Sequence, residues 1–278
     1  MFEGRKLIIA TKHKKEIVIA KHLNEKLGVN CQVSEDFDTD VFGTFTGEKE
    51  RALSPLDTVR KKCLMAMEKF GYDLGVASEG SFGPHPALFF IPADEEFMVF
   101  IDKKNNLEIN VKKLSSDTNF SGRSIKNEEE LEKYIKAIQF PGHGIILRKS
   151  RDSNENIIKD IDSIEQLKKH FKSMVDLLGE VYVETDMRAM NNPTRMKVIE
   201  ETTLKLIEAI KSICPNCSTP GFVPINHIAG LPCSLCGLPT KSIKIKVLGC
   251  KKCGYEMEKI FPNNKKEEDP QYCDYCNP

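Results

Sequence analysis

The sequence predicts an α/β fold, in which a mixed-sheet, three-layer domain is followed by a small zinc-ribbon-like module with two structural zinc sites. Two observations lead to this prediction. Strand-like and helix-like segments alternate over residues 1–210, which is typical of a sheet with helices on both faces. Eight of the ten cysteines then lie within residues 211–278, so we place a domain boundary between residues 210 and 211.

The composition is that of an ordinary globular protein. The 278 residues carry no formal net charge, and 40% of them are hydrophobic. A neutral chain has no overall attraction to nucleic acid or to an anionic membrane, although a local basic groove is not excluded. We find no signal peptide after Met1 and no apolar stretch near the roughly 18 residues that a membrane span needs. We therefore expect a cytoplasmic protein that does not bind a membrane.

The first strand, helix and connecting loop predict a phosphate site. Residues 6–10 read as a strand, and residues 16–27 as a helix that ends at Gly28. The polar loop between them offers hydroxyl and cationic groups at a helix N-terminus, where free amides and the helix dipole attract phosphate. The alternative is a solvated loop. The candidate substrate-binding residues are Thr11, His13, Lys14 and Lys15.

Further elements follow from capping residues and hydrophobic periodicity. Residues 34–53 form a long polar connection, which is typical of a functional loop or an extended hairpin. Ser54, Asn127 and Ser163 are expected N-caps. The expected strands are 31–33, 74–77, 88–91, 96–101, 107–111, 144–148 and 180–183, and the expected helices are 55–70, 128–138, 164–171 and a long one that starts at 194 and leads into Cys214.

The stretch over residues 74–86 is the best candidate for a catalytic loop. Residues 74–77 read as a buried strand, and a loop with Ser78, Glu79, Ser81 and His85 is expected to follow it. In open α/β sheets, ligands bind at the carboxyl ends of strands, so Glu79 is well placed to act on a ligand. The alternative is a polar turn with a solvated Glu79.

The cysteines predict two metal sites. All eight in the last segment fall in Cys-x-x-Cys pairs, a spacing that suits tetrahedral zinc thiolates in a reducing compartment. Four pairs make two structural zinc sites, but spacing does not decide whether neighbouring or interleaved pairs share a metal. The expected ligands are Cys214, Cys217, Cys233, Cys236, Cys250, Cys253, Cys273 and Cys276.

The charge of this module favours a structural or protein-binding role. Residues 211–278 hold nine lysines and six carboxylates, and each tetrathiolate zinc site contributes a charge of −2, so the loaded module is close to −1. Phosphate binding needs a concentrated basic face. We therefore expect the module to act as a structural cap or as a contact for a protein partner, and catalysis by fully ligated zinc is not expected.

Four short motifs carry a resemblance to a known superfamily. They are the loop Ala10-Thr11-Lys12-His13-Lys14-Lys15, the helix start Asp57-Thr58, the turn Ala77-Ser78-Glu79-Gly80-Ser81 and the late Pro193-Thr194-Arg195. Their order resembles the inosine/xanthosine triphosphatase (Maf-like) superfamily of nucleotide hydrolases. His13 and Thr194 depart from its motifs. The whole chain also resembles an uncharacterised bacterial domain family with an eight-cysteine C-terminal tail.

The superfamily resemblance implies a Mg²⁺-dependent nucleotide (phosphoanhydride) hydrolase of the house-cleaning type, with an α/β nucleotide-hydrolase-like domain over residues 1–210. Glu79 and Asp57 would hold Mg²⁺, and Lys14, Lys15 and Arg195 would neutralise phosphate oxygens. Ser78 and Ser81, beside Glu79, are further expected substrate-binding residues. Two alternatives belong to other classes. One is a non-catalytic nucleotide- or RNA-binding protein, and the other is a zinc protein that binds a protein partner.

Overall fold

The structure is a computed structural model that describes residues 1–33 and 53–278. The predicted functional loop or hairpin at 34–53 lies outside these residues, apart from residue 53. Contacts divide the chain into two compact units, Met1–Ile207 and Glu208–Pro278.

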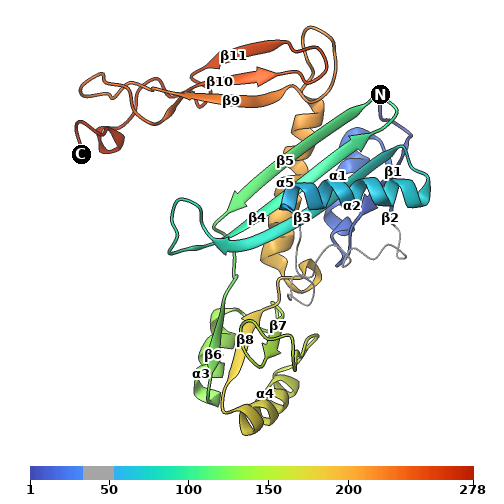
Figure 1. Cartoon of the computed structure of the whole chain (residues 1–278), viewed down its shortest axis with the longest axis vertical. Helices are drawn as coiled ribbons and strands as arrows, with labels where there is room; N and C mark the ends of the chain where they lie inside the picture. The colour runs from blue at the N-terminus through green and yellow to red at the C-terminus, as the bar shows by residue number, and fades with distance from the viewer. Residues whose placement is uncertain (34–52) are drawn as a thin grey trace. The chain divides into compact units, whose positions relative to one another are not determined.

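The first unit is built on a mixed sheet of five strands (Figure 1). The order is β2-β1-β3-β4-β5, in which β1 is parallel to β2 and β3, and β3, β4 and β5 are antiparallel neighbours. The predicted mixed α/β fold is therefore confirmed. The strands are β1 (Lys6–Ala10), β2 (Asn30–Val33), β3 (Leu74–Pro84), β4 (Pro92–Asp102) and β5 (Leu107–Ser115).

The prediction of a loop after Ala77 was wrong. Strand β3 continues through the polar residues to Pro84, and it pairs with β4 from Leu74 opposite Asp102 to Pro84 opposite Pro92. Antiparallel pairing with β4 satisfies the backbone amides and carbonyls of alternate residues, and this long-range gain outweighs the turn preference of serine and glycine. The hairpin turn lies instead where a strand was predicted, at residues 88–91.

Helix boundaries agree well with the capping residues. Helix α1 (Glu16–Leu27) ends at Gly28, whose φ of 67° is left-handed, and α2 (Pro55–Phe70) begins after Ser54, whose hydroxyl accepts from the Asp57 amide. Helix α2 packs on the sheet face that carries Ala77 and Val99. Helix α5 (Pro193–Lys211) contacts the other face, where the Thr203 hydroxyl meets the Met98 sulfur at 3.8 Å.

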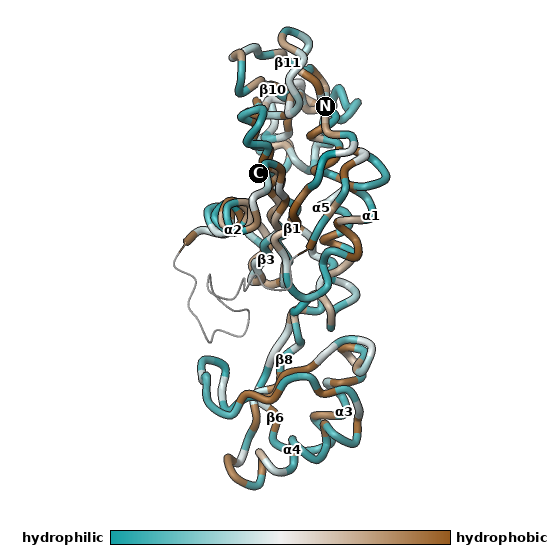
Figure 2. The backbone as a smooth tube through the Cα atoms, turned by 90° about the vertical axis from the view of Figure 1, so that its right-hand side faces the viewer, coloured by the Kyte–Doolittle hydropathy of each residue, from teal (hydrophilic) through white to brown (hydrophobic). Residues whose placement is uncertain are grey.

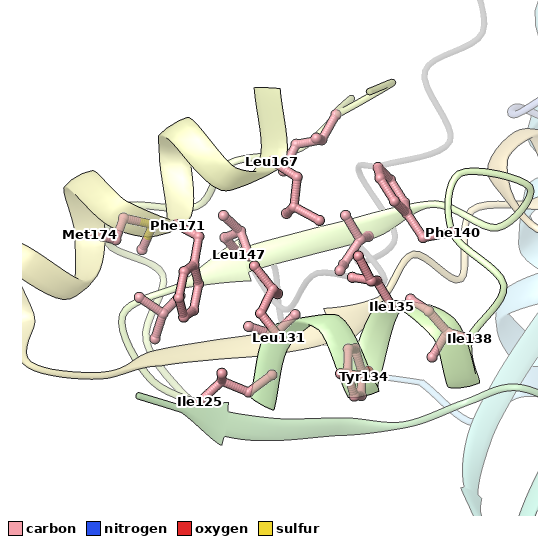
Figure 3. Close-up of a cluster of buried hydrophobic side chains, with 14 residues drawn as sticks. Ile125, Leu131, Tyr134, Ile135, Ile138, Phe140, Leu147, Leu167, Phe171 and Met174 are labelled. Carbon is pink, nitrogen blue, oxygen red and sulfur yellow. The ribbon is translucent and has the colours of Figure 1, made fainter. Parts of the chain in front are cut away.

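A second sheet forms in the segment between β5 and α5. Strands β6 (Gly122–Ile125), β7 (Ile145–Arg148) and β8 (Val181–Thr185) are antiparallel in the order β6-β8-β7. Helices α3 (Glu128–Ala137) and α4 (Ile164–Leu178) alternate hydrophobic and hydrophilic residues along their length (Figure 2). Figure 3 shows their apolar side chains packed with those of the strands, among them Leu131, Tyr134, Leu167 and Phe171.

The second unit contains a three-stranded antiparallel sheet. Strand β10 (Ile243–Gly249) pairs with β9 (Val223–Ala229) and β11 (Glu256–Ile260). The remaining elements of the described residues are two short 3-10 helices, η2 (Ala189–Asn191) in the first unit and η3 (Pro270–Tyr272) in the second. Among the helices in the described ranges, none is both long and apolar enough to span a membrane.

Candidate functional site

Four charged side chains are buried together where β4 meets α5 and the β1–α1 loop. We call Lys15, Asp94, Glu96 and Arg195 the buried charged cluster, because each is at most 4% exposed. Asp94 and Glu96 are two residues apart on β4, so their side chains lie on the same face of the sheet. Charged groups are rarely buried without partners. The buried charged cluster is therefore a candidate functional site.

Arg195 links α5 to the sheet. Its Nε donates to Glu96 Oε1 at 2.7 Å, and its Nη1 donates to the Met187 carbonyl. The guanidinium also lies 4.9 Å from the centre of the Phe82 ring. At its own backbone, the Arg195 amide donates to Asn192 Oδ1 at 3.0 Å, which anchors the first turn of α5. These contacts hold the guanidinium in one orientation.

The close approach of Arg195 to Glu96 requires glycine at position 80. Gly80 lies directly opposite Glu96 in the β3–β4 ladder. A Cβ atom on Gly80 would lie 2.5 Å from Glu96 Oε1 and would also overlap the Arg195 guanidinium. The glycine therefore provides the space in which the two charged groups meet.

Lys15 reaches the same face of the sheet from the β1–α1 loop. Its ammonium donates to Ser78 Oγ at 3.2 Å. Burial, together with the positive charge of Arg195, lowers the pKa of Lys15 to about 8, against the opposing effect of Glu96 and Glu79. Of the three lysines in the predicted phosphate loop, only the last, Lys15, is buried.

Asp94 is the least satisfied member of the cluster. Neither of its carboxylate oxygens has a hydrogen-bond partner among the described residues, and the same holds for Glu96 Oε2. Burial and the negative charge of Glu96 raise the pKa of Asp94 to about 8. A buried carboxylate without donors is costly. Such a group commonly marks a site for an ion or water.

The two predicted metal ligands do not lie beside Asp94 and Glu96, although the charge of Glu79 acts on Lys15. Glu79 is buried on the α2 face, opposite Phe97 in the ladder, and forms an ion pair with Lys62. Asp57 is exposed at the start of α2, where Ser54 Oγ donates to it at 2.6 Å. Asp94 and Glu96, in contrast, lie on the sheet face that Arg195 contacts.

The remaining predicted substrate residues are divided in the same way. Thr11 and Ser78 are buried near Lys15, whereas Lys14 is exposed and His13 is half-buried. Ser81 lies opposite Glu95 on the face that carries Glu79. His13 and Lys14 have left-handed φ values of 66° and 60°, an uncommon conformation for residues other than glycine.

Sequence reasoning missed Asp94 and Glu96, although a signal was present. Both are separated by an even number of positions from Met98 and Phe100, which are fully buried on β4. Alternation along a strand places all four side chains on one face. Two acidic residues on the buried face of a strand would have indicated a functional pair.

The eight cysteines of the second unit form two clusters that could each hold a metal ion. Within each cluster all four sulfurs lie within 4.8 Å of one another. The pairs are interleaved along the chain, a question that spacing had left open. One cluster is Cys214, Cys217, Cys250 and Cys253, and the other is Cys233, Cys236, Cys273 and Cys276.

Local turns and long-range pairing both suit tetrahedral coordination. A metal bound by four sulfurs at about 2.3 Å in a regular tetrahedron keeps the sulfurs about 3.8 Å apart. The closest sulfur pairs contributed by different knuckles are 3.5 to 3.8 Å apart. In each knuckle one amide donates to the carbonyl of the first cysteine at 2.9 Å; the donors are Ser218, Gly237, Gly254 and Asn277.

Comparison with known proteins places the chain in a family. A family model described as "Domain of unknown function (DUF6671)" matches residues 62–278. The chain belongs to this family. No curated protein matches it.

The DUF6671 match bears on the expected relationships. It agrees with the predicted uncharacterised domain family, and it gives no support to the resemblance to inosine/xanthosine triphosphatases. The matched region contains Asp94, Glu96, Arg195 and all eight clustered cysteines, whereas Lys15 lies before it. In this DUF6671 chain, the buried charged cluster therefore combines groups from within and outside the matched region.

Proposed function

We propose that this DUF6671 protein is a Mg²⁺-dependent hydrolase of nucleotide phosphoanhydrides, with Asp94 and Glu96 as its metal ligands. The observation that carries the proposal is the orphaned carboxylate of Asp94, which is fully buried beside Glu96 and has no donor among the described residues. A divalent cation would compensate both carboxylates at once.

The spacing of the two carboxylates suits one cation. Residues two apart on an antiparallel strand have Cα atoms roughly 7 Å apart and side chains on the same face. One ion between the side chains is then within reach of both. Carboxylate oxygens are the ligands that Mg²⁺ prefers. Only Glu96 Oε1 is engaged by Arg195, so Glu96 Oε2 and both Asp94 oxygens are available for coordination.

Two cations of the cluster supply the anion-binding half of the site. Lys15 and Arg195 are buried within the same group, and Lys15 lies close enough to both Glu96 and Arg195 to respond to their charges. Low exposure strengthens each electrostatic contact, since little water screens it. We infer that these two side chains hold phosphate oxygens.

The proposed chemistry divides between the ion and the chain. When bound, Mg²⁺ supplies positive charge that stabilises the transferred phosphoryl group. Asp94 and Glu96 position the ion, and Lys15 and Arg195 orient the phosphate. Gly80 contributes by leaving room for the carboxylate and guanidinium at the sheet surface. Helices α2 and α5 on opposite faces support the expected three-layer arrangement of this domain.

We further propose that the two cysteine clusters hold structural zinc in a zinc-ribbon-like module. Four thiolates complete each tetrahedron, so neither ion keeps a position for substrate. Thiolate sites of this kind persist where cysteines stay reduced, which supports a cytoplasmic location. A contact with a protein partner through this module is the accompanying proposal for its role.

The test is Asp94→Asn in the full-length, zinc-loaded chain, with release of phosphate and pyrophosphate from a nucleotide panel as the readout. We expect Mg²⁺-dependent turnover to fall at least about 100-fold, because one ligand loses its charge. The matched control is Glu95→Gln, since Glu95 points to the other face and pairs with Lys112 at 2.6 Å.

Two outcomes would contradict the hydrolase. One is full turnover in Asp94→Asn. The other is a folded wild type that binds Mg²⁺ and nucleotide but releases no product, a result that would establish the non-catalytic nucleotide-binding alternative. Binding of RNA without nucleotide specificity, with an affinity that falls steeply as salt is added, would identify the RNA-binding form of that alternative.

A further inference from the structure

We propose that Phe82 and Phe120 form a stacking platform for a nucleobase beside the buried charged cluster. The proposal rests on the function proposed above and extends it, because it states which part of the protein recognises the substrate beyond its phosphates. It names the two side chains that would bind the base of the nucleotide, which the proposed function leaves open.

The platform adjoins the charged groups directly. Phe82 lies opposite Asp94 in the β3–β4 ladder, on the same face of the sheet. Its ring lies 4.9 Å from the Arg195 guanidinium, and its centre is 5.7 Å from that of Phe120, with 33° between the ring planes. A molecule with phosphates at Arg195 would therefore have aromatic rings next to it.

The exposure of the two rings differs from that of a core pair. Phe82 and Phe120 are both partly exposed, whereas Phe100, on the same face of β4, is fully buried. Aromatic rings that remain partly open beside a charged group offer a flat apolar surface to a ligand. Stacking on such a surface binds every base, because each base has a π-face.

Phe120 is held in place although it lies outside any helix or strand. It belongs to the connection between β5 and β6, over residues 116–121. The Phe120 amide donates to Thr118 Oγ1 at 3.2 Å, and the next amide, of Ser121, donates to Thr185 Oγ1 at 3.1 Å. An ordered ring loses little freedom when it binds a ligand.

A polar group beside the platform independently points to a ligand. Asn119 Oδ1 accepts from Asn192 Nδ2 at 2.8 Å, while Asn119 Nδ2 is buried and has no acceptor in the part of the chain that the structure describes. A buried amide donor without an acceptor is costly. A ring nitrogen or a carbonyl of a base would satisfy it.

The experiment compares three ligands by isothermal titration calorimetry: ATP, inorganic tripolyphosphate and adenosine, each with Mg²⁺. We expect Phe120→Leu to lower the affinity for ATP and for adenosine about tenfold, because one stacking contact is lost. The affinity for tripolyphosphate should stay unchanged. Phe120→Tyr should retain the wild-type affinities. The matched control is Phe89→Leu, since Phe89 is 82% exposed and lies in the turn between β3 and β4, outside their ladder.

Each result decides between the two proposals. If Phe120→Leu bound ATP and tripolyphosphate with equally reduced affinity, or bound ATP as tightly as wild type, the platform would be overturned and the hydrolase proposal would stand. Adenosine binding that depends on Phe120, with no binding of tripolyphosphate and no turnover, would support the platform and refute the hydrolase. Absence of both ATP and adenosine binding in folded wild type would overturn the platform.

Discussion

Gly80 and Glu96 face each other across the β3–β4 ladder, and the missing side chain of Gly80 provides the space in which Arg195 reaches the Glu96 carboxylate. The neighbouring Glu79 points to the opposite face, toward Lys62 of α2. Two adjacent residues of β3 therefore take part in different sets of contacts on opposite faces of the sheet. One belongs to the buried charged cluster, and the other to an ion pair under a helix.

Gly80→Ala is expected to disturb the cluster. The added Cβ would overlap Arg195 and Glu96, and overpacking of this kind costs about 1–3 kcal/mol. Urea denaturation should show the lower stability, and calorimetry should show weaker Mg²⁺ binding. Gly83→Ala is the control, because nothing lies within 4 Å of a Cβ there. Equal stability of the two variants would contradict the geometry.

Glu79→Gln is expected to act mainly on stability. The substitution breaks the buried Lys62–Glu79 ion pair, and loss of such a pair costs about 3–5 kcal/mol. The exposed Arg60–Glu108 pair provides the comparison, and Glu108→Gln should cost at most about 1 kcal/mol. Chemical denaturation measures both. If Glu79→Gln instead abolished Mg²⁺ binding without loss of stability, Glu79 would be the metal ligand.

The lowered pKa of Lys15 predicts that the stability of the protein depends on pH in the alkaline range. The pKa of Lys15 in the folded state is about 8, below the ordinary value of 10.5. Between these values the unfolded chain binds more protons than the folded one, so stability rises with pH. The rise amounts to up to about 3 kcal/mol and should vanish in Lys15→Met. Lys14→Met, at an exposed neighbour, should keep it, and parallel curves for wild type and Lys15→Met would refute the assignment.

The interleaved cysteine pairing predicts metal stoichiometries. Cys214→Ser combined with Cys250→Ser alters one cluster only, so one zinc should remain; Cys214→Ser combined with Cys233→Ser alters both, so both should be lost. Native mass spectrometry counts the ions. Pairing of neighbouring knuckles would give the reverse result, so the two double variants serve as controls for each other.

Local sequence was sufficient for many elements. Ser54, Asn127 and Ser163 each accept a backbone amide at the start of a helix, as predicted, and Gly28 ends α1 in a left-handed conformation. These signals depend on residues within one turn of each other. The Cys-x-x-Cys spacing is equally local, and it identified all eight cysteines of the two clusters that could hold metal ions.

Tertiary structure decided the features that depend on distant residues. Residues 78–84 became strand rather than loop because β4 supplies their hydrogen bonds. The sequence by itself therefore determined the helix starts and which cysteines gather in the two clusters. The fold alone decided which cysteine pairs meet and that Asp94 and Glu96, rather than Glu79 and Asp57, share a face with Arg195. The physical reason is that capping and knuckle turns are satisfied within a few residues, whereas strand register and ion-pair partners are set by segments up to about a hundred residues away.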